Sequence, residues 1–101
     1  MVIIAKKTIN EFISKHPTST DVLLNWYQET KSADWANFGE MKRTFNSVDA
    51  VGNDRFVFNI KGNDYRLIAI VHFYVRTVYI VFIGTHKEYD KVVASKVKYK
   101  K

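Results

Sequence analysis

The sequence contains no cysteine, and its four glycines form neither a P-loop nor a dinucleotide-binding pattern. The absence of cysteine excludes disulfide bonds, thiolate zinc sites and cysteine nucleophiles. Three histidines remain as metal ligands, but His16, His72 and His86 are scattered and show no His-x-x-x-His spacing. We therefore expect no metal ion and no nucleotide cofactor.

Long hydrophobic runs are also missing. No segment approaches the roughly 18 consecutive apolar residues that a membrane-spanning helix needs. The first seven residues place both lysines after the apolar side chains, which reverses the order found in a secretory signal peptide. We expect a cytoplasmic protein with no membrane partner.

The chain is basic, with 16 lysines and arginines against 10 aspartates and glutamates and a net charge of +6. Such an excess suits a phosphate backbone or an acidic protein as partner, and it is equally compatible with ordinary solubilising charge. Hydrophobic residues make up 47% of the 101 residues, which argues against disorder. At this length we expect a single domain over residues 1–101, with a basic tail from about residue 95.

Residues 1–46 are predicted to form one strand followed by helices. Their apolar side chains begin as a short run and then recur at the spacing of helix faces. Pro17 must end the first helix because proline cannot continue it, and the cap-forming residues that follow favour a second helix. We expect a strand over residues 2–5 and helices from Thr8 to Pro17, over 18–31 and over 37–46.

From Arg55 onward the hydrophobic period changes to two, which is typical of strands. Gly62-Asn63 is a hairpin turn signal, and a second reversal is expected near Arg76-Thr77. The pattern predicts a three-stranded antiparallel meander over residues 55–60, 65–74 and 78–85, with a short helix from His86 onward. The face expected to form the core carries Phe56, Phe58, Ile60, Leu67, Val71 and Phe73. The opposite face carries Arg55, Val57, Asn59, Arg66, Ile68 and Ile70.

Strand pairing brings polar residues together at one end of this α+β fold, in which helices are expected to pack on one face of a twisted sheet. A two-residue turn at Gly62-Asn63 places Asn59 opposite Arg66. Arg66 then faces Lys87 if the second turn has two residues, or His86 if it has three, and the pattern does not decide between them. The cluster predicted in either register comprises Asn59, Arg66, His86 and Lys87, joined by Tyr89 and Asp90 from the following helix.

Such a cluster suits metal-free cleavage of RNA, in which the ribose 2′-hydroxyl attacks the neighbouring phosphate and the 5′-oxygen leaves. A base must take the hydroxyl proton, an acid must protonate the leaving oxygen, and cations must stabilise the phosphorane. Histidine titrates near neutral pH, which suits His86 for either proton role. Lys87 and Tyr89 are further candidates for these roles, and Arg66 offers a forked grip on the phosphate.

Two motifs at a set separation carry a family resemblance. Residues 56–69 read Phe-Val-Phe-Asn-Ile-Lys-Gly-Asn-Asp-Tyr-Arg-Leu-Ile-Ala, and residues 84–90 read Gly-Thr-His-Lys-Glu-Tyr-Asp. Together with the order strand, helix, helix, meander and terminal segment, they resemble HigB-type toxins of the RelE-like superfamily over almost the whole chain. The resemblance implies a RelE-like fold with a short C-terminal helix.

The resemblance also implies a function. Its members are toxins of type II toxin-antitoxin pairs, which act as ribosome-dependent endoribonucleases on translated messenger RNA. A cognate antitoxin, usually a helix-turn-helix protein, neutralises the toxin. Operator DNA is implied as a partner only through the toxin-antitoxin complex.

Site residues follow from the matching positions. Arg66 matches the family's phosphate-stabilising arginine, and His86 matches the histidine at the end of the last strand. We expect Tyr89 or His86 as the base, with Arg66 and Lys87 on the phosphate. Residues expected to bind RNA or to orient a neighbour are Arg55, Asn59, Lys61, Asn63 and Asp90.

Two other functions fit the same residues. A basic module of similar fold can occupy RNA or the ribosome without cutting it, and a protein-interaction subunit can use its positive surface for an acidic partner. Singly, His86 also fits a helix-capping or solvated role, and Arg66 fits an ion pair with Asp64 or Asp90.

Overall fold

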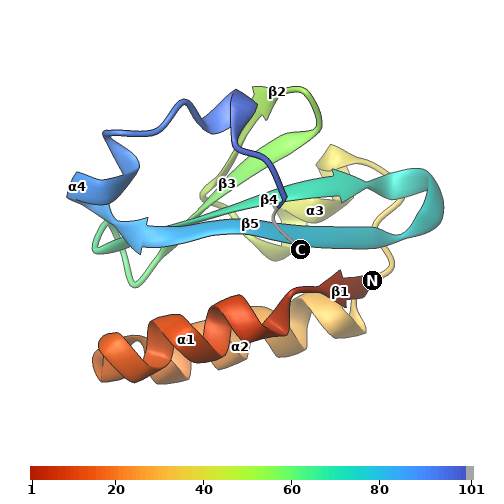
Figure 1. Cartoon of the computed structure of the whole chain (residues 1–101). Coiled ribbons are helices and arrows are strands. Elements are labelled where there is room, and N and C mark those ends of the chain that lie inside the picture. Colours follow the sequence, from red (N-terminus) through yellow and green to blue (C-terminus); the bar gives the residue numbers. More distant parts are fainter. Residues whose placement is uncertain (100–101) are drawn as a thin grey trace.

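Five strands form one mixed sheet in the computed structural model, which describes residues 1–99 (Figure 1). The strand order is β1-β5-β4-β3-β2, so the predicted meander β3-β4-β5 occupies the middle. Only β1 pairs in parallel, with β5, which confirms a mainly antiparallel sheet joined by the N-terminal strand. The strands are β1 (Val2–Ile4), β2 (Val48–Gly52), β3 (Arg55–Ile60), β4 (Tyr65–His72) and β5 (Thr77–Thr85).

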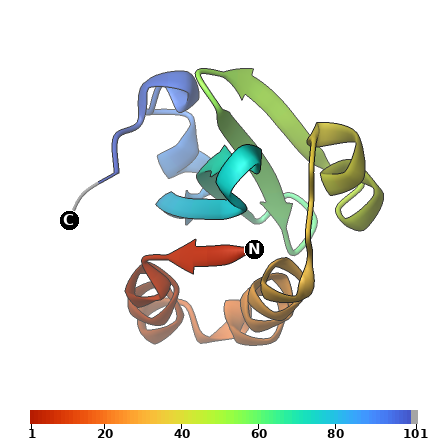
Figure 2. The same ribbon diagram turned by 90° about the vertical axis from the view of Figure 1, so that its right-hand side faces the viewer.

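Two long helices, α1 and α2, lie side by side against one face of the sheet (Figures 1 and 2). Pro17 separates them, because it starts a short 3₁₀ turn between the two. The third helix, α3, begins where the Asn37 side chain accepts a hydrogen bond from the backbone N–H of Glu40 at 3.0 Å. The helices are α1 (Lys6–Lys15), α2 (Thr20–Ser32), α3 (Phe38–Thr44) and α4 (His86–Tyr89).

The main core lies between these helices and the sheet. Trp26 of α2 meets Phe58 of β3 edge-on, with 5.3 Å between ring centroids, and Phe45 packs against both rings. Five of the six predicted core residues of the meander are buried, which confirms the facing of the strands: Phe56, Phe58, Ile60, Leu67 and Val71. The sixth, Phe73, lies in a 3₁₀ turn and packs half-buried against the core.

The register between β3 and β4 is the predicted one, with Asn59 opposite Arg66. The register between β4 and β5 differs from both alternatives, because Arg66 pairs with Gly84 instead of His86 or Lys87. The link between the strands, residues 73–76, is longer than a two- or three-residue turn, and a bulge after Ile68 shifts the pairing by one residue. His86 is therefore the first residue of α4, beyond the end of the strand.

A smaller apolar layer lies on the second face of the sheet, where Val57 is 3% exposed and Ile68 is fully buried. The segment after α4 covers this face and contacts β2 and β3. Arg55 ties it down, because its Nε and Nη2 donate to the carbonyl oxygen of Val97 at 3.0 and 2.7 Å. The segment expected as a basic tail is thus anchored through Val97, while its residues 100 and 101 lie outside the described part.

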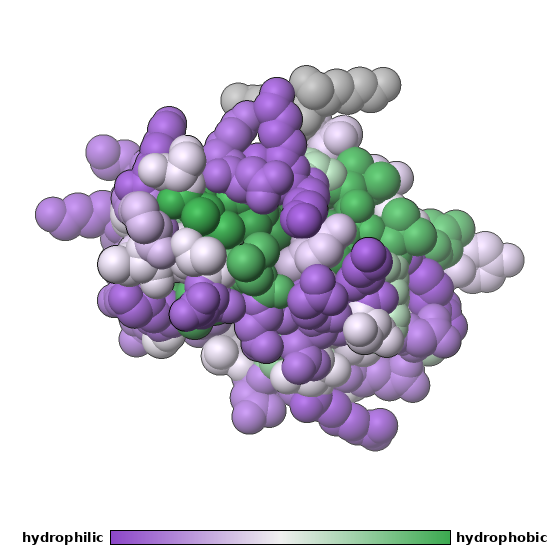
Figure 3. Space-filling view, turned by 90° about the horizontal axis from the view of Figure 1, so that it is seen from below, coloured by the Kyte–Doolittle hydropathy of each residue, from purple (hydrophilic) through white to green (hydrophobic). Residues whose placement is uncertain are grey.

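Strand β2 has no counterpart in the sequence prediction, because its alternation of side chains is short and includes Asp49 and Gly52. It lies at the edge of the sheet beside β3 (Figure 2). Seen from the side of α1 and α2, the surface is largely hydrophilic, with hydrophobic side chains gathered in patches between the polar ones (Figure 3). Within residues 1–99, no helix has the length and apolar character needed to cross a bilayer.

Candidate active site

Arg66 is the centre of the polar cluster at the end of β4. Its Nη1 donates to the backbone carbonyl oxygens of Asn63 and Tyr65 at 3.0 and 3.3 Å, which fixes the guanidinium at the mouth of the β3-β4 turn. Its Nη2 lies 3.2 Å from Nδ1 of His86. The guanidinium carbon also lies 5.6 Å from the centre of the Tyr89 ring, within range of a cation–π contact.

The tautomer of His86 follows from these contacts. An arginine N–H can only donate, so Nδ1 of His86 accepts the bond and the proton of the neutral ring is on Nε2. Nε2 in turn lies 3.4 Å from the Asp90 carboxylate, one helical turn further along. Arg66, His86 and Asp90 therefore form one chain of contacts from the sheet to α4.

The start of α4 is fixed by a capping box. Thr85 Oγ1 accepts from the backbone N–H of Glu88 at 3.2 Å, and Glu88 Oε1 accepts from the backbone N–H of Thr85 at 2.8 Å. The bond from the Thr85 backbone is the main reason that the pKa of Glu88 lies below its ordinary value, with smaller contributions from the Thr85 side chain and from His16 and Lys15. Sequence reasoning gave Thr85 and Glu88 no role, although the Thr-x-x-Glu spacing signals this cap.

Gly84, opposite Arg66, is a second residue that sequence reasoning missed. A Cβ at this position would lie 2.5 Å from Cζ of Phe82 and 3.1 Å from Cβ of Glu88. The absence of a side chain therefore lets α4 fold back closely on the end of β5. This close approach brings His86 within reach of Arg66.

The remaining predicted residues of the cluster lie around this centre. Asn59 is half-buried directly opposite Arg66, and Asn63 contributes its carbonyl oxygen. Lys61 is exposed in the β3-β4 turn, and Lys87 is exposed on α4. Two exposed cationic side chains thus follow the strands that end on the same side of the sheet as Arg66.

Arg55 is the predicted residue that the structure does not bring to the cluster. It lies four residues before Asn59 on β3, which at about 3.3 Å per residue places it roughly 13 Å away along the strand. Its guanidinium is occupied by the carbonyl oxygens of Val97 and Asn53. A direct contact of Arg55 with RNA stays a prediction.

The arrangement provides the parts that acid-base chemistry at a phosphate needs. An imidazole with a defined tautomer, a phenol and a guanidinium meet at an exposed edge of the fold, with an orienting carboxylate behind the imidazole. Within the described residues, no group of three or more histidine, aspartate or glutamate side chains is placed to hold a metal ion.

Known proteins are similar to this sequence over most of its length. A family model described as the RelE-like toxic component of a toxin-antitoxin system matches residues 19–92. The chain is 31% identical over 94 residues to the mRNA interferase HigB of Escherichia coli O6:H1, covering 91% of each chain. It is 30% identical over 92 residues to the mRNA interferase HigB of Shigella flexneri, covering 89% of this chain and 88% of the relative. The chain belongs to the HigB toxin family, the RelE-like toxic component of toxin-antitoxin systems.

Proposed function

We propose that this protein is a metal-independent endoribonuclease that cleaves messenger RNA as it is translated on the ribosome. The observation that carries the proposal is the contact of Arg66 with His86 beside the Tyr89 ring, at an exposed end of the sheet. The names of the relatives, mRNA interferases, support the choice of substrate. The net charge of +6 favours a polyanion as well.

In the proposed reaction, the ribose 2′-oxygen attacks the adjacent phosphorus and the bond from phosphorus to the 5′-oxygen breaks. The products are a 2′,3′-cyclic phosphate and a 5′-hydroxyl end, so no water is consumed in this step. Arg66 and Lys87 stabilise the charge on the phosphorane. One donor of this kind is worth about 3 kcal/mol of transition-state stabilisation in other enzymes.

The contacts of His86 support one assignment of the proton roles. In the free protein Arg66 occupies Nδ1 of His86. A phosphate that draws the Arg66 guanidinium to itself frees Nδ1 to take the 2′-hydroxyl proton, and Asp90 then stabilises the imidazolium that forms. Tyr89 and Lys87 are left as the proton donors for the 5′-oxygen.

The proposed biological setting is a type II toxin-antitoxin pair in the cytoplasm. A cognate antitoxin, proposed to be a helix-turn-helix protein, binds the toxin and stops cleavage. Operator DNA is contacted only through the complex of the two proteins. Asn59, Lys61 and Asn63 are proposed to hold RNA beside the reacting phosphate.

Primer extension on messenger RNA from a reconstituted translation reaction tests the proposal. The protein should produce new 5′ ends in translated messages, and Arg66→Ala together with His86→Gln should abolish them. A protein that co-sediments with ribosomes but leaves every message intact is a non-catalytic RNA- or ribosome-binding module, the alternative function. The cut ends should be a 2′,3′-cyclic phosphate and a 5′-hydroxyl, and ends with a 3′-hydroxyl and a 5′-phosphate would refute the proposed metal-independent mechanism.

A further inference from the structure

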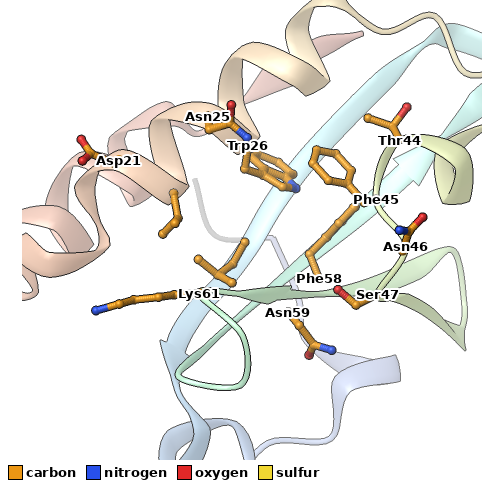
Figure 4. Close-up of a pocket in the computed structure, with 12 residues that line it drawn as sticks. Asp21, Asn25, Trp26, Thr44, Phe45, Asn46, Ser47, Phe58, Asn59 and Lys61 are labelled. Atoms are coloured by element: carbon orange, nitrogen blue, oxygen red, sulfur yellow. The ribbon is translucent and has the colours of Figure 1, made fainter.

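A pocket of about 460 Å³ opens beside α2, and neither Arg66 nor His86 is among the residues that line it (Figure 4). It lies between α2, the segment that links α3 to β2, and the end of β3. Its apolar lining includes Trp26, Phe45 and Phe58, and its polar residues include Asn25, Asn46 and Ser47. None of these side chains takes part in the proposed cleavage.

One residue that lines this pocket, Trp26, has a buried polar group with no partner among the described residues. Trp26 is 2% exposed, and its Nε1 is buried without a hydrogen bond among the described residues. The other tryptophan, Trp35, donates its Nε1 to Thr44 Oγ1 at 3.0 Å. Burying a donor without an acceptor is costly, so native structures rarely keep one. An acceptor on a bound partner would remove this cost.

Figure 4 shows where such an acceptor would enter. The indole nitrogen of Trp26 lies at the end of the ring that faces Phe45 and Phe58. Phe45 stacks on Trp26 with 6.3 Å between ring centroids and is only half-buried. A ligand that turns Phe45 aside therefore reaches the indole N–H from the pocket.

An open strand edge runs along the same pocket. Pairing of β2 with β3 begins at Val48 and Phe58, so Asn59 and Ile60 pair with β4 on one side and with no strand on the other. The residues just before β2 do not continue its pairing with β3. They form a turn in which the backbone N–H of Val48 donates to the carbonyl oxygen of Phe45 at 3.4 Å. Both Asn59 and Ile60 line the pocket. An extended peptide can pair with such an open strand edge as an added strand.

We propose that an extended segment of the antitoxin adds as a strand to β3 at residues 59–61 and inserts a side chain with a hydrogen-bond acceptor toward Trp26. This inference rests on the proposed function, which supplies the antitoxin as partner. A peptide is favoured over RNA because the charged residues that line the pocket, Asp21 and Lys61, balance each other. Open backbone groups of a strand edge also complement a peptide backbone, whereas a phosphate chain needs cations.

The location explains how docking would stop cleavage. Asn59 pairs with Arg66, so the added strand lies one strand away from the candidate catalytic arginine. The same segment contacts Lys61, which is proposed to hold RNA. Antitoxin and messenger RNA therefore compete at the β3-β4 turn.

A pair of tryptophan substitutions on α2 tests the proposal. Asn25 lines the pocket, whereas Gln28 on the same helix does not, and both side chains are exposed. With the cognate antitoxin as the probe, Asn25→Trp should bind at least 10-fold more weakly by calorimetry and should still cleave messenger RNA. Gln28→Trp should match the wild type in both assays. Equal antitoxin affinity of the two variants, or loss of cleavage by Asn25→Trp with antitoxin binding intact, overturns the proposal.

Two further readouts separate this contact from a general loss of packing. Hydrogen exchange of the backbone amides at residues 59–61 should slow when the antitoxin binds, because an added strand covers them. Trp26→Phe keeps an aromatic ring and removes the donor, so it should weaken antitoxin binding about 5-fold. Unchanged exchange at residues 59–61 refutes strand addition. Because both measurements follow binding, they decide the proposal even if the chain proves to cleave no RNA.

Discussion

The guanidinium of Arg66 donates a hydrogen bond to Nδ1 of His86 at 3.2 Å, joining two residues that are 20 positions apart in sequence. Gly84, opposite Arg66, leaves room for α4 to approach the end of the sheet closely, because a Cβ there would lie 3.1 Å from Cβ of Glu88. The two side chains form one unit, in which the arginine fixes the tautomer of the histidine.

Replacement of Arg66 should remove most of the cleavage activity. We expect Arg66→Ala to lower the cleavage rate about 10²- to 10³-fold, as the loss of one oxyanion donor does elsewhere. Because the side chain is only half-buried, the midpoint of thermal unfolding should change little. Single-turnover cleavage of translated messages measures the rate, and Arg43→Ala, at an exposed position on α3, is the matched control.

Asp90 should act through His86. Asp90→Asn keeps the size of the side chain but removes the negative charge 3.4 Å from Nε2, so we expect it to lower kcat about 10-fold with little change in KM. His86→Gln should cost more than Asp90→Asn. Nitrogen NMR of the imidazole should report a proton on Nε2 in the free wild-type protein. A proton on Nδ1 would contradict the proposed tautomer.

Arg55 should contribute to stability more than to RNA cleavage. Its charged hydrogen bonds to Val97 hold the C-terminal segment over Val57 and Ile68, so Arg55→Ala should lower the free energy of unfolding by about 1.5–3 kcal/mol. Arg55→Lys keeps the charge but cannot donate two hydrogen bonds to Val97 as the guanidinium does. In urea denaturation it should therefore show most of the destabilisation of Arg55→Ala. If Arg55→Lys is as stable as the wild type while Arg55→Ala cleaves poorly, the residue acts on RNA instead.

The capping box of α4 predicts a pH dependence of stability. The pKa of Glu88 is lowered in the folded state by its bond to the Thr85 backbone, so its contribution to stability is complete above the unfolded pKa, about 4.3. That contribution is lost as the pH falls through the lower, folded-state pKa. Wild type and Glu88→Gln should therefore differ by a constant free energy of unfolding above about pH 5. The difference should shrink below pH 4, and a difference that grows on acidification would contradict this sign.

Most of the fold could be predicted because the spacing of the hydrophobic residues and the residues that end helices and strands agree along the chain. Alternating side chains from Phe56 to Ile60 identified the core face, and Pro17 separated the first two helices as the structure has them. Strand β2 was missed because it is short and carries polar residues at a sheet edge. Its pairing depends on contacts with β3 that no local pattern reveals.

The sequence predicted which residues lie at the candidate site more fully than it predicted how they are arranged. The motif around Arg66 and His86 identified which side chains meet, but their register depends on the link at residues 73–76 and on the bulge after Ile68. Neither is visible in a hydrophobic pattern, because each changes spacing without changing composition. Arg55 shows the opposite case, a residue whose charge suggested RNA and whose described partners are backbone carbonyls.

The bulge in the β4-β5 ribbon makes the site dependent on correct pairing of these two strands. Arg66 and His86 lie at the end of the ribbon farthest from the link at residues 73–76, so a shift of register anywhere along it changes which residue stands opposite Arg66. A slip of one residue turns alternate side chains to the opposite face. A chain paired in the wrong register would therefore lack the contact of Arg66 with His86.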